Sequence, residues 1–334
     1  MTNVGKTFKL GVLMDSIESI TPYKDSTLAM LLAAQRKDWG ASLEIHYFQQ
    51  ADLSVVQGAA RAKSRVIRVH DNNDHWFDYL SEPEWRNLAD FQVVLMRKDP
   101  PFDMEYIYST YLLERAEEAG TLVVNRCQSL RDVNEKVYIS WFPQCTAPTL
   151  ISRNRELIKE FVAEHGEAVI KPLDGMGGAS IFRLAVDEPN LNVILDTMVG
   201  NNQTQAMVQK FLPEISSGDK RILIIDGEPM PYALARIPSK GEFRGNLAAG
   251  GRGVGVPLSE RDRWLCEQIK PTLKEKGLMF VGLDVIGDYV TEINVTSPTC
   301  IRELDKEFGL DIGGALMDAI AARFTDSRHS KEAE

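Results

Sequence analysis

The chain has 334 residues, of which 44% are hydrophobic and 26% charged, and its formal net charge is −10. This composition is typical of a globular protein with about two or three domains. Because no basic run with interleaved aromatic residues offsets the negative charge, nucleic acid is excluded as an expected partner.

Residues 1–125 alternate strand-like and helix-like segments, which predicts a βαβ arrangement on a parallel sheet. Strands are expected at residues 9–14, 43–48, 64–69, 91–96 and 122–124. Helices are expected at residues 25–38 and 104–119, each followed closely by a glycine. Neither common phosphate-loop glycine pattern occurs in this part, so we do not expect a Rossmann or Walker nucleotide site.

From residue 126 the pattern changes to short strands separated by longer helices. Strands are expected at residues 168–171, 179–184, 206–210, 220–226, 232–237, 278–284 and 289–294. Helices are expected at residues 133–141, from a cap at Ser152 to about residue 165, and at 191–199, 259–276, 300–308 and 312–323. The polar tail, residues 325–334, is expected to be frayed.

Residues 238–257 contain six glycines, three cationic side chains and little apolar material. A structureless loop of this length inside a compact domain is unusual unless it is functional. Lys240, Arg244 and Arg252 favour a lid that closes over an anion, most simply a phosphate. The alternative is a disordered surface insertion.

A second glycine-rich segment, residues 171–178, lies between two predicted strands. Gly175, Gly177 and Gly178 let backbone N–H groups turn toward a phosphate, and Lys171 adds a point charge. A tight glycine hairpin with an incidental lysine fits the same residues.

Asp284, Glu292 and Asn294 lie at facing ends of two adjacent predicted strands. Glu292 and Asn294 are two residues apart, so both point to one face of their strand. Three oxygen ligands on one face suit Mg²⁺. The alternative is a solvated polar face, but the intervening residues are apolar, which favours the metal.

Three cationic residues, each taken alone, could have either an anion-binding or a purely structural role. Arg221 begins one predicted strand and Arg236 ends the next, and arginine suits fork-like binding of carboxylate or phosphate. Either could instead cover apolar neighbours with its stem. Lys136 is equally ambiguous.

The positions of the cysteines and histidines do not indicate a Cys-x-x-Cys site or a zinc site. The four cysteines form no Cys-x-x-Cys pair, and the N-terminus has no apolar signal core, which together favour reduced thiols in a cytoplasmic protein. The longest uninterrupted apolar run, residues 28–34, is too short to cross a bilayer. The five histidines are scattered, so we expect no zinc site.

Taken together, these segments resemble the ATP-grasp ligases and, in more detail, the bacterial glutathione synthetases. The resemblance is carried by Ser-Leu-Arg-Asp-x-Asn-Glu-Lys at 129–136, Lys-Pro-Leu-Asp-Gly-Met-Gly-Gly at 171–178, Gly-Asp-Lys-Arg at 218–221, Arg-Gly-Asn-Leu-Ala-Ala-Gly-Gly-Arg-Gly at 244–253, Thr-Glu-Ile-Asn-Val-Thr-Ser-Pro-Thr at 291–299 and Asp-Pro-Pro-Phe-Asp at 99–103. It spans nearly the whole chain. One departure is Val-Gly-Val-Pro at 254–257, where more polar residues are expected.

The resemblance implies an α/β protein, α+β in its C-terminal half, with the ATP-grasp fold. It implies an N-terminal parallel-sheet βαβ domain (1–125), a central lid domain (126–204) and a C-terminal antiparallel-sheet catalytic domain (205–324) carrying the mobile loop 238–257. It further implies that ATP phosphorylates γ-glutamylcysteine and that glycine then displaces the phosphate, giving glutathione, ADP and phosphate. Mg²⁺, or alternatively Mn²⁺, is the implied metal, and a homo-oligomer is the implied assembly.

The resemblance also implies residue roles. The implied metal ligands are Asp284, Glu292 and Asn294. The implied ATP-binding residues are Lys136, Lys171, Gly175, Gly177, Gly178, Gln209, Lys210, Phe211 and Leu212. Catalytic roles fall to Arg221, Arg236 and Arg244, and substrate-binding roles to Arg252, Ser297 and Thr299. Two alternatives stay open: an ATP-grasp ligase that joins another carboxylate and amine, and a non-catalytic nucleotide-binding regulatory protein.

Overall fold

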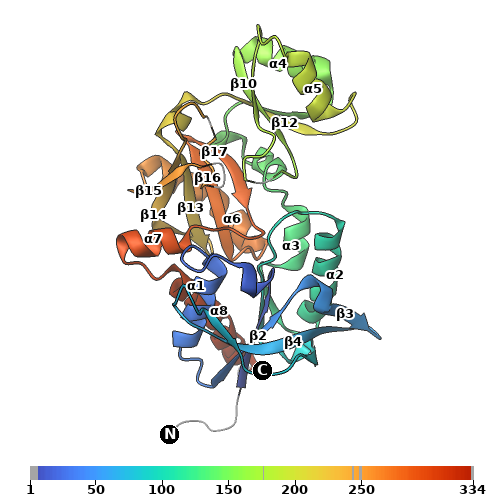
Figure 1. Ribbon diagram of the computed structural model, residues 1–334, viewed down its shortest axis with the longest axis vertical. Coiled ribbons are helices and arrows are strands. Elements are labelled where there is room, and N and C mark those ends of the chain that lie inside the picture. The colour runs from blue at the N-terminus through green and yellow to red at the C-terminus, as the bar shows by residue number, and fades with distance from the viewer. Residues whose placement is uncertain (1–6, 176, 243, 248–249, 332–334) are drawn as a thin grey trace.

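A computed structural model describes residues 7–331 of the chain, except residues 176, 243, 248 and 249. The strands among the described residues form three sheets, which follow one another along the long axis of the molecule (Figure 1). The β-strands are β1 (Thr7–Leu13), β2 (Ser42–Phe48), β3 (Leu53–Val56), β4 (Ala59–Val69), β5 (Phe77–Tyr79), β6 (Glu84–Asn87), β7 (Val93–Met96), β8 (Leu122–Val124), β9 (Thr149–Ser152), β10 (Glu167–Pro172), β11 (Phe182–Ala185), β12 (Ala206–Lys210), β13 (Asp219–Ile225), β14 (Glu228–Ile237), β15 (Arg252–Pro257), β16 (Phe280–Ile286) and β17 (Tyr289–Asn294). The α-helices are α1 (Ser26–Arg36), α2 (Met104–Glu118), α3 (Cys127–Asp132), α4 (Arg155–His165), α5 (Leu191–Val199), α6 (Glu260–Glu275), α7 (Ile301–Phe308) and α8 (Ile312–Lys331).

The first sheet has a parallel centre, as the βαβ pattern predicts. β1 pairs in parallel with β2 and β7, and β7 pairs in parallel with β8. Leu10 and Val12 of β1 pack in one core with α1 and α8, whereas Leu13 packs in another core with α2. Helices therefore cover both faces, which explains the continuous apolar runs. The sheet is mixed rather than purely parallel, because β4 pairs antiparallel with β2, β3, β5 and β6.

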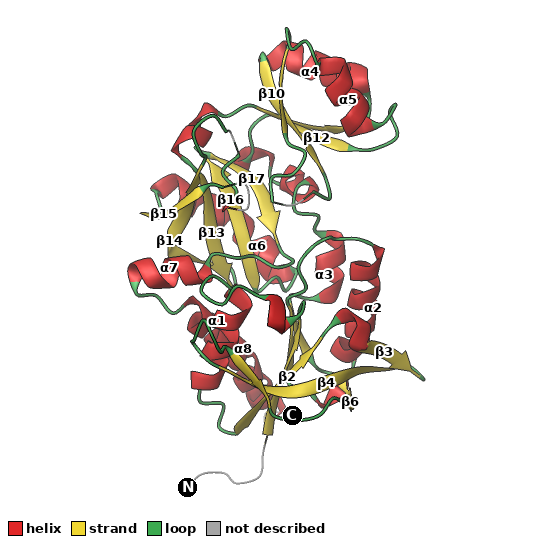
Figure 2. Cartoon of the chain, viewed as in Figure 1, coloured by secondary structure: helices red, strands yellow, loops and turns green. Residues whose placement is uncertain are grey.

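The second sheet is a compact antiparallel unit in the order β11-β10-β12-β9. α4 and α5 lie over one of its faces, at the end of the molecule far from the N-terminus (Figure 2). The predicted hairpin is present, because β10 pairs antiparallel with β11. The predicted cap at Ser152 is wrong: Asn154 caps α4, and its side chain accepts hydrogen bonds from the Glu156 and Leu157 amides.

The third sheet has the order β15-β14-β13-β16-β17, and all its pairings are antiparallel. Ser259 begins α6 with a capping box, since its side chain accepts from the Asp262 amide while Asp262 accepts from the Ser259 amide.

Three further sequence predictions are corrected by the structure. The α-helix predicted at 133–141 is not formed: α3 ends at Asp132, and a 3₁₀ helix follows at Val137–Trp141. The Asn134 side chain accepts hydrogen bonds from the Lys136 and Val137 amides, which competes with a continuous helix. The predicted frayed tail is helical as far as Lys331, because α8 continues through it; residues 332–334 lie outside the described residues.

The third correction concerns the loop predicted at 238–257. Its last six residues form β15, which pairs with β14 from Tyr232↔Pro257 to Ile237↔Arg252. The loop also has an apolar anchor, because Leu247 is partly buried against one of the main cores. The predicted loop is therefore shortened to residues 238–251, of which residues 243, 248 and 249 lie outside the described residues.

One helix from the N-terminal part of the chain and one from its C-terminal part lie together against the first sheet. α8 packs against α1, and Gly313 permits the close approach, since a Cβ there would lie 2.9 Å from the Ala29 carbonyl oxygen. Asn125 connects the first and third sheets: its side chain donates to the Phe280 and Val295 carbonyls and accepts from the Phe280 amide. Among the described helices, none has the length and apolar content needed to cross a bilayer.

Candidate active site

Two neighbouring cavities lie where the second and third sheets face each other. The larger has a volume of about 260 Å³ and the smaller about 70 Å³. The larger is lined by residues of the β10–β11 loop, the third sheet and the segment after β17. Glu292, Ile181 and Asn246 line both cavities, so the two spaces adjoin at these residues.

The floor of the larger cavity is a buried cluster of arginines and aspartates. Asp284 on β16 lies opposite Arg221 on β13 in the strand register. Arg221 donates to both carboxylate oxygens of Asp284 through Nε and Nη2, and Arg236 Nη2 lies 2.9 Å from Asp284 Oδ2. Arg236 also donates to Asp219 at 2.5 Å. All four residues are at least 92% buried.

Burial and charge act in opposite directions on these groups. Burial alone would raise the pKa of Asp284, but Arg221 and Arg236 hold it well below its usual value. Burial raises the pKa of Asp219 to about 6, although Arg236 opposes the shift. The pKa of Arg236 is raised, because Asp219 and Asp284 outweigh its burial. The two arginines therefore remain cationic in the cavity floor, as anion binding requires.

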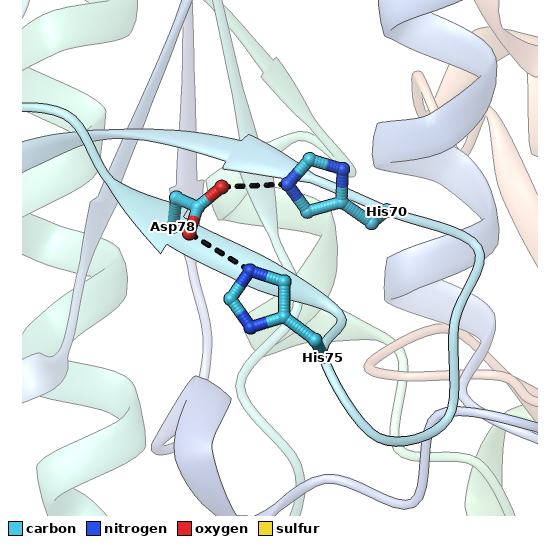
Figure 3. Close-up of side chains that lie close together, drawn as sticks. All are labelled: His70, His75 and Asp78. Atoms are coloured by element: carbon cyan, nitrogen blue, oxygen red, sulfur yellow. Dashed lines mark hydrogen bonds and ion pairs between the residues drawn. The ribbon is translucent and has the colours of Figure 1, made fainter.

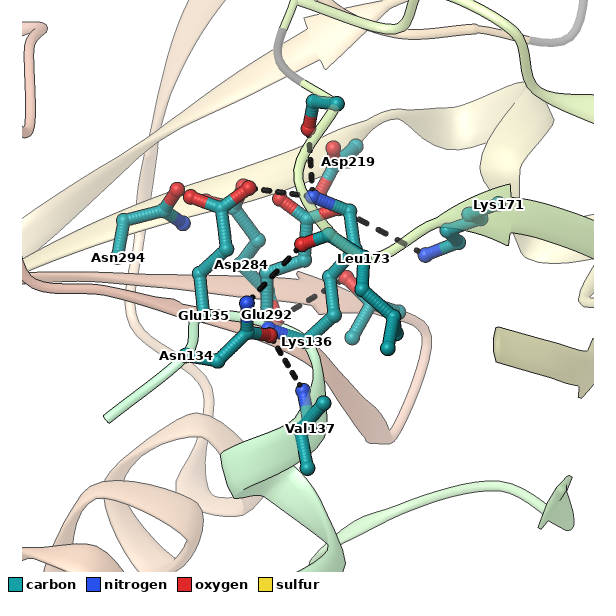
Figure 4. A network of polar contacts seen from close by, with 12 residues as sticks. Asn134, Glu135, Lys136, Val137, Lys171, Leu173, Asp219, Asp284, Glu292 and Asn294 are labelled. Atoms are coloured by element: carbon teal, nitrogen blue, oxygen red, sulfur yellow. Dashed lines mark hydrogen bonds and ion pairs between the residues drawn. The ribbon is translucent and has the colours of Figure 1, made fainter. Parts of the chain in front are cut away.

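A second cluster contains carboxylates and lysines at the junction of the two cavities (Figure 4). Lys136 Nζ and Lys171 Nζ each lie 3.8 Å from Glu292 Oε1. Lys136 also forms an ion pair with Glu135 and donates to the Gly175 carbonyl at 2.7 Å. Burial and the nearby charge of Glu292 raise the pKa of Glu135. Chain segments far apart in the sequence thus place two carboxylates and two ammonium groups in one small volume.

Asn294 lies one pleat from Glu292 on β17, as the two-residue spacing predicts. Its Nδ2 donates to the Gly282 carbonyl at 3.2 Å. This bond orients the amide group and does not use its Oδ1 atom. Glu292 and Asn294 both line the larger cavity. Asp284 does not line it, but its carboxylate binds the two arginines that do.

The smaller cavity is lined by the four residues predicted to contact adenine, Gln209, Lys210, Phe211 and Leu212, together with Lys171. The backbone of this segment is partly engaged within the protein: the Lys210 amide donates to Pro148 and the Phe211 amide to Glu167. Gln209 is buried and donates to the Thr149 hydroxyl.

The glycine loop and the lid segment meet over the larger cavity. Arg244 Nη1 donates to the Gly178 carbonyl at 3.1 Å, and its Nη2 pairs with Glu242. Gly178 has φ +81°, and a Cβ there would lie 2.7 Å from Asn246 Oδ1. A glycine is therefore required for this contact. Gly175, Gly177 and Gly178 all line the larger cavity.

The structure brings most but not all of the remaining predicted residues to the cavities. Ser297 and Thr299 line the larger one, beside Asp99 from the end of the first sheet. Arg252 does not: it is exposed at the start of β15 and lines neither cavity.

Glu135 and Asp219 are the residues to which sequence reasoning gave no role. Both lie within motifs that carry the resemblance: Glu135 precedes Lys136, and Asp219 lies two residues before Arg221. The available signal was therefore an acidic residue close to a cation with a predicted anion-binding role.

Comparison with known proteins agrees with this arrangement. The family model for the ATP-grasp domain of prokaryotic glutathione synthetase matches residues 135–309, and that for its N-terminal domain matches residues 8–131. A glutathione synthetase of Pseudomonas putida is 60% identical over 312 residues, covering 93% of this chain and 97% of that protein. One from Escherichia coli O127:H6 is 56% identical over 315 residues, covering 94% and 98%.

Among solved structures, D-cycloserine synthetase DcsG has a TM-score of 0.65 at 16% identity, over 94% of this chain and 99% of that chain. At this sequence identity the structural similarity is evidence for the fold alone. The fold agrees with an ATP-grasp architecture. The family matches adjoin each other and together cover most of the sequence. The chain therefore belongs to the prokaryotic glutathione synthetase family of ATP-grasp ligases.

Proposed function

We propose that this protein ligates γ-glutamylcysteine and glycine at the expense of ATP. The γ-phosphoryl group of ATP passes to the C-terminal carboxylate of γ-glutamylcysteine, and the amine of glycine then attacks the acyl carbon and displaces phosphate. The products are glutathione, ADP and phosphate. The activity named for relatives that are 56–60% identical over nearly their full length supports this choice of substrates.

One geometric observation carries the proposal. Glu292, Lys136 and Lys171 lie at the junction of the smaller cavity and the larger cavity, whose lining includes Arg221 and Arg236. We refer to the smaller cavity, which Phe211 and Leu212 line, as the slot. A nucleotide with its base in the slot would place its phosphates at this junction. Its terminal phosphate would then reach the cavity that Arg221, Arg236, Ser297 and Thr299 line.

The residues at the junction fit the divalent metal ion that ATP-grasp ligases use. Burial, together with the charge of Glu292, raises the pKa of Glu135, and a bound cation would stabilise both carboxylates. Asp284 accepts three hydrogen bonds from arginine, which leaves about one of the roughly four lone-pair positions of a carboxylate. We propose Asp284, Glu292 and Asn294 as the ligands, of Mg²⁺ or alternatively Mn²⁺. When bound, the ion would neutralise phosphate charge.

The protein's own side chains perform the remaining work. Lys136 and Lys171 hold the phosphate oxygens, and in doing so exchange their present contacts with Glu292 for contacts with the nucleotide. Arg221 and Arg236 offer N–H groups to the transferring phosphoryl group and to the acyl phosphate, where charge accumulates. Because they are already held by Asp284 and Asp219, they need little reorganisation. No side-chain nucleophile is needed.

The contact between Arg244 and Gly178 suggests how water is kept out. We propose that the segment 238–251 closes against the glycine loop, as this hydrogen bond already allows, and protects the acyl phosphate from hydrolysis until glycine attacks. We also propose Gly175, Gly177 and Gly178 as phosphate-binding residues, Gln209 to Leu212 as the adenine site, and Ser297 and Thr299 as peptide-binding residues.

A phosphate-release assay tests the proposal directly. With ATP, Mg²⁺ and γ-glutamylcysteine, glycine should release phosphate far faster than larger amines such as leucine, because the cavity of about 260 Å³ leaves little room beside the peptide. Rapid phosphate release without any dependence on glycine, or a strong preference for another carboxylate, would favour an ATP-grasp ligase with different substrates.

Two broader features remain proposals. We expect the protein to work in the cytoplasm, in agreement with its four buried cysteines, which are all free thiols. We also expect a homo-oligomer. The division of the chain after residues 125 and 204 likewise stays a prediction.

A further inference from the structure

The hairpin between β4 and β5 places two imidazoles around one carboxylate (Figure 3). His70 Nε2 lies 2.7 Å from Asp78 Oδ2, and His75 Nε2 lies 2.9 Å from Asp78 Oδ1. One nitrogen from each ring and a carboxylate oxygen all lie within 4.8 Å of one another. This cluster is remote from the two cavities described above, since none of its members lines either of them.

The strand register explains why His70 and Asp78 meet. Arg68 pairs with Asp78 across the hairpin, and His70 is two residues further along the chain, just past the end of β4, so its side chain lies on the same face as that pair. The His70 amide donates to the Trp76 carbonyl at 2.8 Å, which holds the two chains together beyond the last paired residues.

The turn then brings His75 back over the same face. The Asn72 side chain accepts hydrogen bonds from the Asp74 and His75 amides, which fixes the turn. The Trp76 indole donates to the Ile17 carbonyl at 2.8 Å and anchors the hairpin on the first domain. The two imidazole rings are nearly parallel, with centroids 5.4 Å apart and planes inclined by 22°. The three side chains are therefore held in place by the backbone around them.

We propose that His70, His75 and Asp78 form a binding site for one divalent transition-metal ion of the zinc class. Imidazole nitrogen with a carboxylate oxygen is a ligand set that such ions favour and that Mg²⁺ does not. In a tetrahedral zinc site with bonds of about 2.0–2.1 Å, neighbouring ligand atoms are about 3.3 Å apart. The two nitrogen–oxygen distances are already close to that separation, so small side-chain rotations suffice.

Metal binding would replace the two hydrogen bonds without consuming any other reactant. In the free hairpin each Nε2 donates its proton to Asp78. In the bound form each neutral ring carries its proton on Nδ1 and presents the Nε2 lone pair to the ion, while Asp78 supplies one oxygen. Three protein ligands leave a fourth position for water.

The surrounding charges are mixed but permit a cation. Arg68 lies opposite Asp78 in the register and opposes binding. Asp74 lies in the turn itself, and Asp71, which follows His70, pairs with Arg302 at 2.6 Å. His75 has 64% of its side chain exposed, so an ion from solution has direct access. The scattered positions of the histidines in the sequence predicted no zinc site, but the turn brings two of them to one carboxylate.

The test is isothermal titration of Zn²⁺ into the full-length, tag-free protein, with excess Mg²⁺ present to occupy the site proposed at Glu292. His70→Gln, His75→Gln and Asp78→Asn each remove one ligand and keep similar volume. His165→Gln is the matched control. His165 lies on α4, and among the ring contacts of the described residues its one partner is Phe161. Thermal unfolding followed by circular dichroism verifies that each variant is folded.

We expect one Zn²⁺ per chain in the wild type and in His165→Gln, and a loss of affinity of at least about tenfold in each of the three ligand variants. Ligase activity with Mg²⁺ alone should be unchanged in His75→Gln, which separates this site from the proposed function. Wild-type protein that binds no Zn²⁺, or Zn²⁺ binding that survives either histidine substitution in a folded variant, would overturn the proposal.

Discussion

Replacement of Arg221 by methionine tests whether the side chains of the buried arginine–aspartate cluster are energetically coupled. Arg221 donates two hydrogen bonds to Asp284, and both side chains are more than 90% buried. Methionine retains much of the apolar stem, which lies close to Gly282. The substitution therefore removes the charge and the hydrogen bonds while disturbing the packing little.

The structure sets the expected size of the effect. Breaking a buried ion pair by removing one partner typically costs about 3–5 kcal/mol, because the other charge is left without compensation. Asp284 would keep Arg236 at 2.9 Å, so we expect Arg221→Met to lower the free energy of unfolding by about 3 kcal/mol, the lower end of that range. Adding Asp284→Asn removes the stranded charge, and we expect it to restore about 1–3 kcal/mol as a coupling energy.

The assay is urea unfolding of the wild type, both single variants and the double variant, followed by tryptophan fluorescence and by circular dichroism. Coincident transitions from the two probes establish that a free energy can be extracted. A loss below about 1 kcal/mol in Arg221→Met, as for an exposed ion pair, would refute the reasoning. So would additive effects of the two substitutions, because they would mean that the cluster is not coupled.

Three further predictions use other parts of the molecule. Glu292→Gln should abolish turnover and leave the unfolding transition close to that of the wild type; near-normal activity at ordinary Mg²⁺ would remove Glu292 from the mechanism. Burial, aided by Asp311, raises the pKa of Asp305 to about 6, so its carboxylate destabilises the fold increasingly as pH rises from about 4 to 6. Asp305→Asn should therefore match the wild type in urea unfolding at pH 4 and exceed it by about 1 kcal/mol at pH 8, after allowance for solvent screening; equal stability at both values would contradict the pKa shift. Trypsin should cut after Lys240 and Arg244 quickly in the free protein and slowly with ATP, Mg²⁺ and γ-glutamylcysteine, as followed by mass spectrometry; equal resistance with and without ligands would mean that the lid does not move.

Features set by neighbouring residues were predictable from the sequence. α5 and β12 have the expected bounds, and Glu292 and Asn294 share a face of β17, because hydrophobic periodicity and two-residue alternation are local properties. The resemblance of the motifs to one family identified the fold. The residues to which it implied roles line the two cavities, except Arg252 and Asp284.

Features set by distant partners were not predictable in the same way. β15 forms because β14 offers an edge to residues that look like a glycine-rich loop. The predicted helix at 133–141 is interrupted because the Asn134 side chain bonds the backbone two and three residues ahead. The pairing of Asp284 with two arginines, and of two histidines with Asp78, depends on strand register, which the spacing of single residues does not reveal.

Transfer of an oxygen isotope tests the central claim most directly. γ-Glutamylcysteine labelled with ¹⁸O in its C-terminal carboxylate is incubated with ATP, Mg²⁺ and glycine, and the released phosphate is analysed by mass spectrometry. If the carboxylate is phosphorylated before glycine attacks, one of its oxygens leaves with the phosphate, and the phosphate carries ¹⁸O in proportion to the glutathione formed. Glutathione formed together with unlabelled phosphate would contradict an acyl-phosphate pathway and with it the roles proposed for Arg221 and Arg236.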